Sequence, residues 1–213
     1  PTRRSSDLPV IPLKPDALIM ADPGLIDLVR ESWPEMPVHL SVQANTLNFA
    51  AVRFWKKLGV SRIILSRELS LDEVAEIRQE CPDISLITCH DETLCVSWFP
   101  GMDGALIGFA GCVPEIICPA REVFANPDKH TLKEAQDWSD RIYHISQAIY
   151  GGGQPSGEAH ARLKEALKQR GIFSSALMRK PVLPLNQEEK DWVALGLERS
   201  QLPEVDMTQF EDK

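Results

Sequence analysis

Residues 62–80, RIILSRELSLDEVAEIRQE, contain the structural unit that decides the fold of this chain. The mainly apolar run 62–65 predicts a buried strand, and the polar residues 66–68 predict its end. Ser70 and Glu73 then form a capping box, because each side chain can accept a hydrogen bond from a free backbone amide at the start of a helix. The segment therefore predicts a strand that is followed directly by a helix.

The same order of strand and helix occurs five times between residues 16 and 124. Strands are expected at 17–21, 38–42, 62–65, 84–88 and 105–109. Helices are expected to start near Pro23, Leu47, Ser70, Leu94 and Pro114. The strands are almost continuously apolar, which is typical of parallel strands covered on both faces. Repeated units of this kind predict an α/β fold, either an open doubly wound sheet or a (β/α) barrel.

From Thr131 onward the chain has only helical patterns, which include a second capping box at Thr131 and Glu134 and a last helix from Asn186. The sequence therefore predicts four regions along the chain. These are a disordered or artefactual N-terminus at 1–13, a partial barrel at 14–127, a helical extension at 128–203 and an acidic tail at 204–213.

The composition limits the class of partner. The chain of 213 residues has a formal net charge of −8, and its Lys and Arg residues form no run, so nucleic acid is not expected as the main partner. The longest apolar stretch, 105–118, is broken by Gly and Pro and is too short for a bilayer, so no membrane partner is expected. The first ten residues lack the apolar core of a signal peptide, which favours a cytoplasmic location.

The five cysteines are expected to be reduced residues of the core, since free cysteine is among the most buried residue types. They form no C-x-x-C pair, so the sequence predicts neither a metal site nor a cofactor. They are Cys81, Cys89, Cys95, Cys112 and Cys118.

Residues 16–83 closely resemble part of the U32 (collagenase-like) peptidase family, in the branch of the prephenate-dependent tRNA hydroxylation proteins. The matching text is DALIMADPGLIDLVRESWPEMPVHLSVQANTLNFAAVRFWKKLGVSRIILSRELSLDEVAEIRQECPD. The resemblance implies a (β/α)₈ barrel with peptidase or tRNA-modifying activity. In that family a Gly-Ala-Leu-Cys segment and further cysteines come next, whereas this chain has ISLITCHDETLCVSW at 84–98.

Residues 84–203 instead resemble the end of the dihydrodipicolinate synthase and N-acetylneuraminate lyase family. The resemblance rests on ISLITCHDETLCVSWFPGMDGALIGFAGCVPEIICPAREVFAN at 84–126 and GEAHARLKEALKQRGIFSSALMRKPVLPLNQEEKDWV at 157–193. It implies the last two barrel strands, a helical extension and a 2-keto acid substrate. The family's Schiff-base lysine would fall at about Leu65, next to Ser66 and Arg67, and arginine is too basic to serve as that nucleophile.

The two resemblances together predict a composite with a seam near 82–84, which contains the fourth to eighth barrel strands. A full barrel usually takes about 250 residues, so we expect a partial barrel that is catalytically incomplete and self-associates through its open edges. One alternative is an oligomeric lyase or small-anion-binding enzyme that acts on a 2-keto acid. Another is a U32-like peptidase or tRNA-modification protein. If the chain is an enzyme, lyase chemistry is favoured over peptidase chemistry.

Polar residues follow three of the predicted strands, at the barrel edge where active sites form. Glu68 or His90 would act as acid or base, and Arg67 would anchor a carboxylate. The alternative is that these residues only cap helices or carry solvated charges. The full set is Gln43, Asn45, Ser66, Arg67, Glu68, His90, Asp91 and Glu92.

A second candidate site lies at the glycine-rich stretch that follows the last predicted strand. The backbone amides of Gly111 and Cys112 precede a helix and, with Gly108, could bind a small carboxylate or keto acid. The alternative is that these glycines only form tight turns beside a buried strand.

Overall fold

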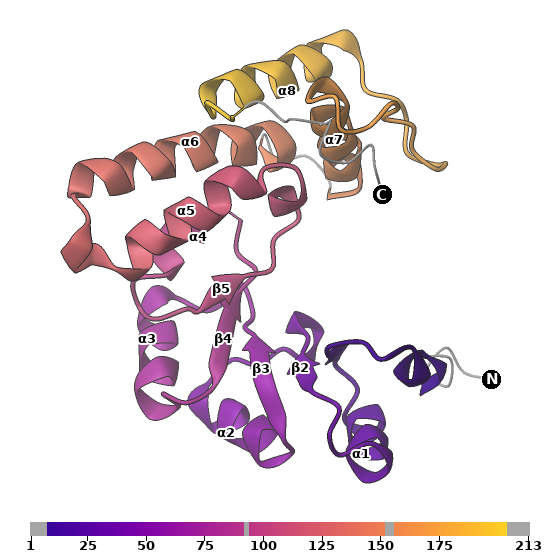
Figure 1. The fold of residues 1–213 in the computed structure, drawn as a ribbon, viewed down its shortest axis with the longest axis vertical. Helices are drawn as coiled ribbons and strands as arrows, with labels where there is room; N and C mark the ends of the chain where they lie inside the picture. The colour runs from indigo at the N-terminus through magenta and orange to yellow at the C-terminus, as the bar shows by residue number, and fades with distance from the viewer. Residues whose placement is uncertain (1–7, 92–93, 152–155, 204–213) are drawn as a thin grey trace. The chain divides into compact units, whose positions relative to one another are not determined.

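The computed structural model describes residues 8–91, 94–151 and 156–203. The chain divides into two compact units, residues 1–106 and 107–213, and each unit is described by itself (Figure 1).

The first unit is built on a parallel sheet in which each strand pairs with the strand before it, in the order β1-β2-β3-β4-β5. A doubly wound sheet reverses its strand order at a switch point, whereas a barrel does not. The order therefore confirms the prediction of a partial (β/α) barrel. The strands are β1 Leu18–Met20, β2 Val38–Leu40, β3 Val60–Ile64, β4 Ser85–Thr88 and β5 Gly104–Ala105.

Helices connect the strands, and they begin where the sequence places capping residues. Asp22 accepts a hydrogen bond from the Leu25 amide at 2.9 Å, and Ser70 and Glu73 form the expected capping box. Gly59, with φ of 79°, ends α2 in the left-handed conformation that favours glycine. The helices are α1 Pro23–Ser32, α2 Phe49–Lys57, α3 Leu71–Glu80 and α4 Leu94–Ser97, with short 3₁₀ helices η2 Leu8–Leu13 and η3 Val42–Ala44.

The two faces of the sheet differ in burial, which departs from the prediction of strands covered on both sides. Leu40, Ile63 and Leu86 share one face through the strand register and are completely buried. On the opposite face Ile19 is 56% exposed and Arg62 is exposed as well. The second face would be the interior of a closed barrel, and within this unit it is only partly covered.

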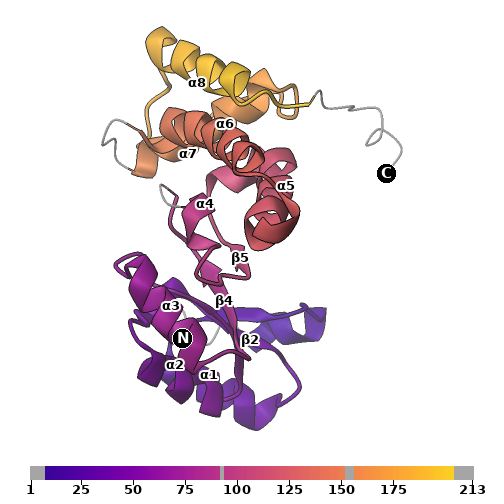
Figure 2. The same cartoon turned by 90° about the vertical axis from the view of Figure 1, so that its left-hand side faces the viewer.

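The second unit is helical, and α6 lies at its centre. α6 packs against α5 and α8, and α7 contacts both α6 and α8 (Figure 2). None of the described helices combines the length and the apolarity that crossing a bilayer requires. The elements are η4 Phe109–Gly111, α5 Pro114–Ala125, η5 Pro127–Lys129, α6 Leu132–Tyr150, α7 Ser156–Gln169 and α8 Gln187–Arg199.

The structure differs from the predicted boundaries most clearly near the last strand, at the N-terminus and at the division between the units. The last strand was expected at 105–109, but β5 ends at Ala105 and Phe109 already belongs to η4. The expected disorder of 1–13 does not extend to Leu8–Leu13, which form η2 with Ile11 buried. The units divide at 106/107 rather than near 127, because α5 packs against α6 of the helical unit. Residues 1–7 and the predicted tail 204–213 lie outside the described residues.

The exposed edge strand β1 predicts that the chain self-associates in solution. Open strand edges pair readily with further strands, and a lysine on such an edge opposes that pairing. We expect light scattering to find oligomers of the unaltered chain and a shift toward monomer for Ile19→Lys. Leu28→Lys, at a 49% exposed position on α1, is the matched control and should leave the oligomers intact. A monodisperse monomer for the unaltered chain would contradict the prediction.

Candidate functional site

A group of polar side chains lies at the carboxyl ends of β2, β3 and β4. Because these strands are parallel neighbours, the residues that follow them come together at one edge of the sheet. Asn45 ends η3 after β2, Ser66 follows β3, and Cys89 follows β4. We call this group, together with Arg67, Glu68 and Asp91, the strand-end cluster.

Ser66 connects two parts of the strand-end cluster. It is only 8% exposed, and its hydroxyl lies 3.3 Å from Asn45 Oδ1 and also hydrogen bonds to the Glu68 carboxylate. A buried hydroxyl with defined partners is held in one orientation. Ser66 therefore fixes the position of Glu68 relative to the end of η3.

Cys89 is the buried centre of the cluster. Its thiol donates to the Leu65 carbonyl at 3.3 Å, and the Arg67 guanidinium lies near the same sulfur. Burial raises the pKa of the Cys89 thiol, and Arg67 offsets only part of this effect. Asp91 and Glu68 raise the pKa further through their negative charge. The thiol is therefore protonated at neutral pH, which is not the form that attacks substrates or binds metals.

The structure brings most of the predicted strand-end residues together, but not all of them. Arg67, Glu68 and Asp91 all lie close enough to Cys89 for their charges to change the pKa of its thiol. Gln43 is exposed on η3, and the His90 ring makes no hydrogen bond or ion pair with another described residue. Glu92 lies outside the described residues. Cys89 is a buried free cysteine, as the sequence predicted, and its position directly after a strand could also have indicated a place in the site.

The second predicted site, at Gly108, Gly111 and Cys112, has a different character. The Gly111 amide donates to the Gly108 carbonyl at 3.2 Å, and the Cys112 amide donates to Phe109 at 3.0 Å. These amides therefore stabilise η4 and are not directed at a ligand, which departs from the anion site expected there.

The start of α5, which follows these amides, carries an ion pair and a buried thiol. Glu115, in the first turn of α5, pairs with the buried Arg170, whose Nη2 lies 2.7 Å from Glu115 Oε1. Arg170 also donates to the Cys112 carbonyl. Burial raises the pKa of the Cys112 thiol to about 12. The start of α5 is thus neutralised by the protein's own ion pair.

In the part of the chain that the structure describes, no three His, Cys, Asp or Glu side chains are arranged to hold a metal ion.

Residues 9–98 match the model of peptidase family U32. This match covers the strand-end cluster from Asn45 to Asp91. The tRNA hydroxylation protein P of Haemophilus influenzae is 61% identical over 90 residues, which are 42% of this chain and 20% of that protein. The protein of the same name from Escherichia coli is 57% identical over 90 residues, with the same coverage of both chains. The chain thus spans about a fifth of the length of these curated relatives.

The fold of the chain resembles dihydrodipicolinate synthase. A dihydrodipicolinate synthase (dapA) structure superimposes with a TM-score of 0.69 at 18% identity, over 92% of this chain and 69% of that one. The enzyme from Thermotoga maritima gives a TM-score of 0.70 at 14% identity, over 94% and 71%. At such identity the likeness concerns the fold alone. Both resemblances seen in the sequence are therefore confirmed, the first as a family match of 9–98 and the second as a shared barrel fold.

Burial of the thiols predicts a strict order of cysteine alkylation. Cys118 is exposed, whereas Cys89 and Cys112 are buried and have raised pKa values, so little thiolate forms at about pH 8. We expect iodoacetamide to modify Cys118 first in the folded protein, as measured by peptide mass spectrometry. Cys89 and Cys112 should react only after denaturation. Rapid alkylation of Cys89 in the folded chain would show that the strand-end cluster is open and that its thiol is activated.

Proposed function

We propose that the strand-end cluster binds a small carboxylate, such as a 2-keto acid, and that the chain has no class I aldolase activity. The observation that carries this proposal is the position of Arg67 after β3, next to Ser66 in the chain and near enough to Cys89 to lower the pKa of its thiol. An arginine at this position can bind a carboxylate but cannot form a Schiff base.

The lysines of the first unit support the absence of Schiff-base chemistry. Lys56 and Lys57 lie in the last turn of α2, and Lys14 precedes β1. Lys56 also pairs with Asp83. None of the described strands of this unit is followed by a lysine at its carboxyl end. This supports the proposal that the chain lacks the nucleophile that the lyase family uses.

The neighbours of Arg67 favour a ligand that carries more than a carboxylate. Glu68 and Asp91 add two negative charges to the cluster, which oppose the binding of a simple anion. They can instead accept a hydrogen bond from a hydroxyl of the ligand, while Arg67 pairs with its carboxylate. Prephenate, which gives its name to the family branch that residues 16–83 resemble, has both kinds of group and is a suitable test ligand beside pyruvate.

A second candidate function is participation in tRNA hydroxylation. It is favoured by the 61% identity with the Haemophilus influenzae tRNA hydroxylation protein P over the segment of 90 residues. The net charge of −8 indicates that the chain itself is not the main tRNA-binding surface. Expression in an Escherichia coli strain that lacks its protein P would test this role, and restored tRNA hydroxylation would support it.

The absence of a Schiff-base lysine predicts that pyruvate and borohydride leave no adduct on the protein. Reduction with borohydride traps a lysine–keto acid imine as a stable mass increase, so intact-protein mass spectrometry measures it directly. We expect the mass to stay unchanged, while a dihydrodipicolinate synthase treated in parallel gains the adduct. A reduced pyruvyl group on any lysine would overturn the proposal that aldolase chemistry is absent.

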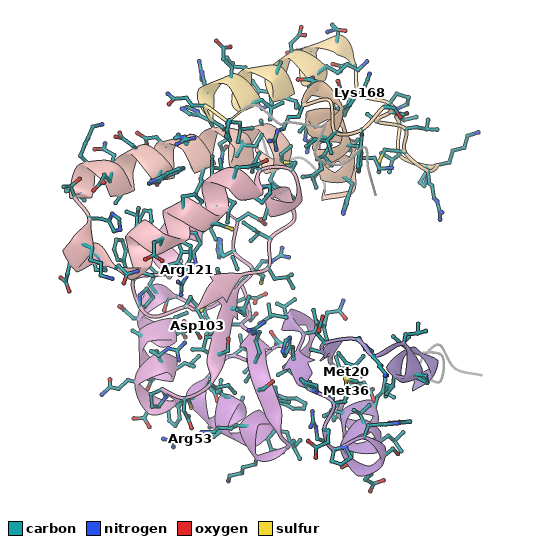
Figure 3. All side chains as sticks on the ribbon, in the orientation of Figure 1. Met20, Met36, Arg53, Asp103, Arg121 and Lys168 are labelled. Carbon is teal, nitrogen blue, oxygen red and sulfur yellow. The ribbon has the colours of Figure 1, made fainter. Side chains whose placement is uncertain are left out.

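We expect that removal of the Arg67 guanidinium weakens carboxylate binding. In calorimetric titrations with pyruvate and with prephenate, Arg67→Met should weaken binding by about tenfold or more, the usual effect of losing a charged hydrogen bond. Arg53→Met is the matched control, since Arg53 is an exposed cation on α2 (Figure 3). It should leave the affinity unchanged. Equal affinities for the Arg67 variant and the unaltered chain, or no heat from either ligand, would contradict the proposal.

A further inference from the structure

We propose that the second unit contains a separate binding site for a small zwitterion, namely an α-amino acid with an apolar side chain. The site is a cavity of about 610 Å³ whose lining comes from the end of α6, from α7 and from α8. This volume is in the range of small-molecule sites in proteins. The chemistry of the ligand follows from three features of the lining, which are a buried cation, a group of carboxylates and an apolar wall.

The buried cation is Arg162 on α7, which is only 4% exposed. Its Nε donates to the Ile149 carbonyl at 2.6 Å, and its Nη1 lies 3.8 Å from Glu158 Oε2. Its Nη2 is buried and has no hydrogen-bond partner among the residues that the structure describes. A buried charged donor without an acceptor is costly, and a ligand carboxylate would supply that acceptor. Arg162, which lines the cavity, is therefore the residue that we assign to a ligand carboxylate.

The start of α8 contributes three acidic residues to the same cavity. Glu189 accepts a hydrogen bond from the Asn186 amide at 2.8 Å, and Asp191 accepts one from the Gln187 side chain at 2.8 Å. Glu188 makes no hydrogen bond or ion pair with another described residue. This group of carboxylates would repel a simple anion but would attract an ammonium group. Together with Arg162 it selects a ligand that carries both charges.

The apolar wall consists of Trp192 and Leu195, one turn apart on α8. The Trp192 indole is half exposed, and its Nε1 donates to the Gln147 carbonyl at 3.4 Å. An indole held at one end offers a fixed apolar surface against which an aromatic or aliphatic side chain can stack. A smaller adjoining cavity of about 250 Å³, also lined by Trp192 and Leu195, extends this surface. The ligand is therefore expected to have an apolar side chain.

Calorimetric titration of the full chain with L-phenylalanine and two analogues tests the site. 3-Phenylpropionate lacks the ammonium group, and phenethylamine lacks the carboxylate. We expect L-phenylalanine to bind saturably and each analogue to bind about tenfold more weakly, because each loses one charged contact. Equal binding of L-phenylalanine and 3-phenylpropionate would overturn the zwitterion assignment, and no saturable binding of L-phenylalanine would overturn the site.

Variants assign the two charged contacts. Glu188→Gln should weaken the binding of L-phenylalanine about tenfold and leave the binding of 3-phenylpropionate unchanged. Arg162→Lys should weaken the binding of both ligands. Glu198→Gln on α8 and Lys168→Gln on α7 (Figure 3) are matched controls outside the cavity lining and should change neither affinity. If the Arg162→Lys variant loses its helical circular dichroism signal, the Glu188→Gln variant and the two analogues still test the site. An unchanged affinity of the Glu188→Gln variant for L-phenylalanine would overturn the proposal. Arg67→Met should retain L-phenylalanine binding, which separates this site from the strand-end cluster.

Discussion

Parallel pairing of each strand with its predecessor is the constraint on which the first unit depends. The register, for example Ile63 beside Leu86, leaves every strand pointing the same way and every following turn at the same edge. Ser66 and Asn45 are thereby in contact although they are 21 residues apart in the chain. The strand-end cluster is a direct consequence of this pairing, and Asn45 joins it from the left-handed conformation, with φ of 50°, that ends η3.

The chemistry available at that edge depends on the residue type at the end of β3. Arg67 is permanently charged and has a planar set of donors, so it suits the recognition of a carboxylate and not covalent catalysis. Its positive charge lowers the pKa of the nearby Cys89 thiol, but burial has the larger effect and keeps the thiol protonated. The cluster thus combines a cation, two carboxylates and a hydroxyl, and the proposal of a carboxylate ligand rests on this combination.

In both units, arginine side chains connect a helix to the segment beyond it through backbone carbonyls. Arg78 on α3 donates to Gly101 at 2.9 Å and to Ile84 at 2.9 Å, which ties the helix to both ends of the segment containing β4. Arg141 on α6 donates to the Ser200 carbonyl at 2.9 Å and so holds the end of α8. Guanidinium groups serve this purpose well because several donors of one side chain satisfy carbonyls that no helix or strand uses. Arg162 also donates to a backbone carbonyl, that of Ile149, but its buried Nη2 has no partner among the described residues.

The sequence by itself determined the order of strands and helices, the helix starts and the candidate residues at the strand ends. These features depend on local physical chemistry, such as the capping box of Ser70 and Glu73 or the left-handed Gly59, which operates over a few residues. Only the tertiary structure decided that the sheet winds in one direction, because periodicity carries no information on which strands are neighbours. It also decided that the Gly111 and Cys112 amides stabilise η4, and that a buried arginine of α7 shares a cavity with the carboxylates of α8. Those outcomes depend on contacts between residues distant in the chain, and on hydrogen-bond partners that composition and spacing do not specify.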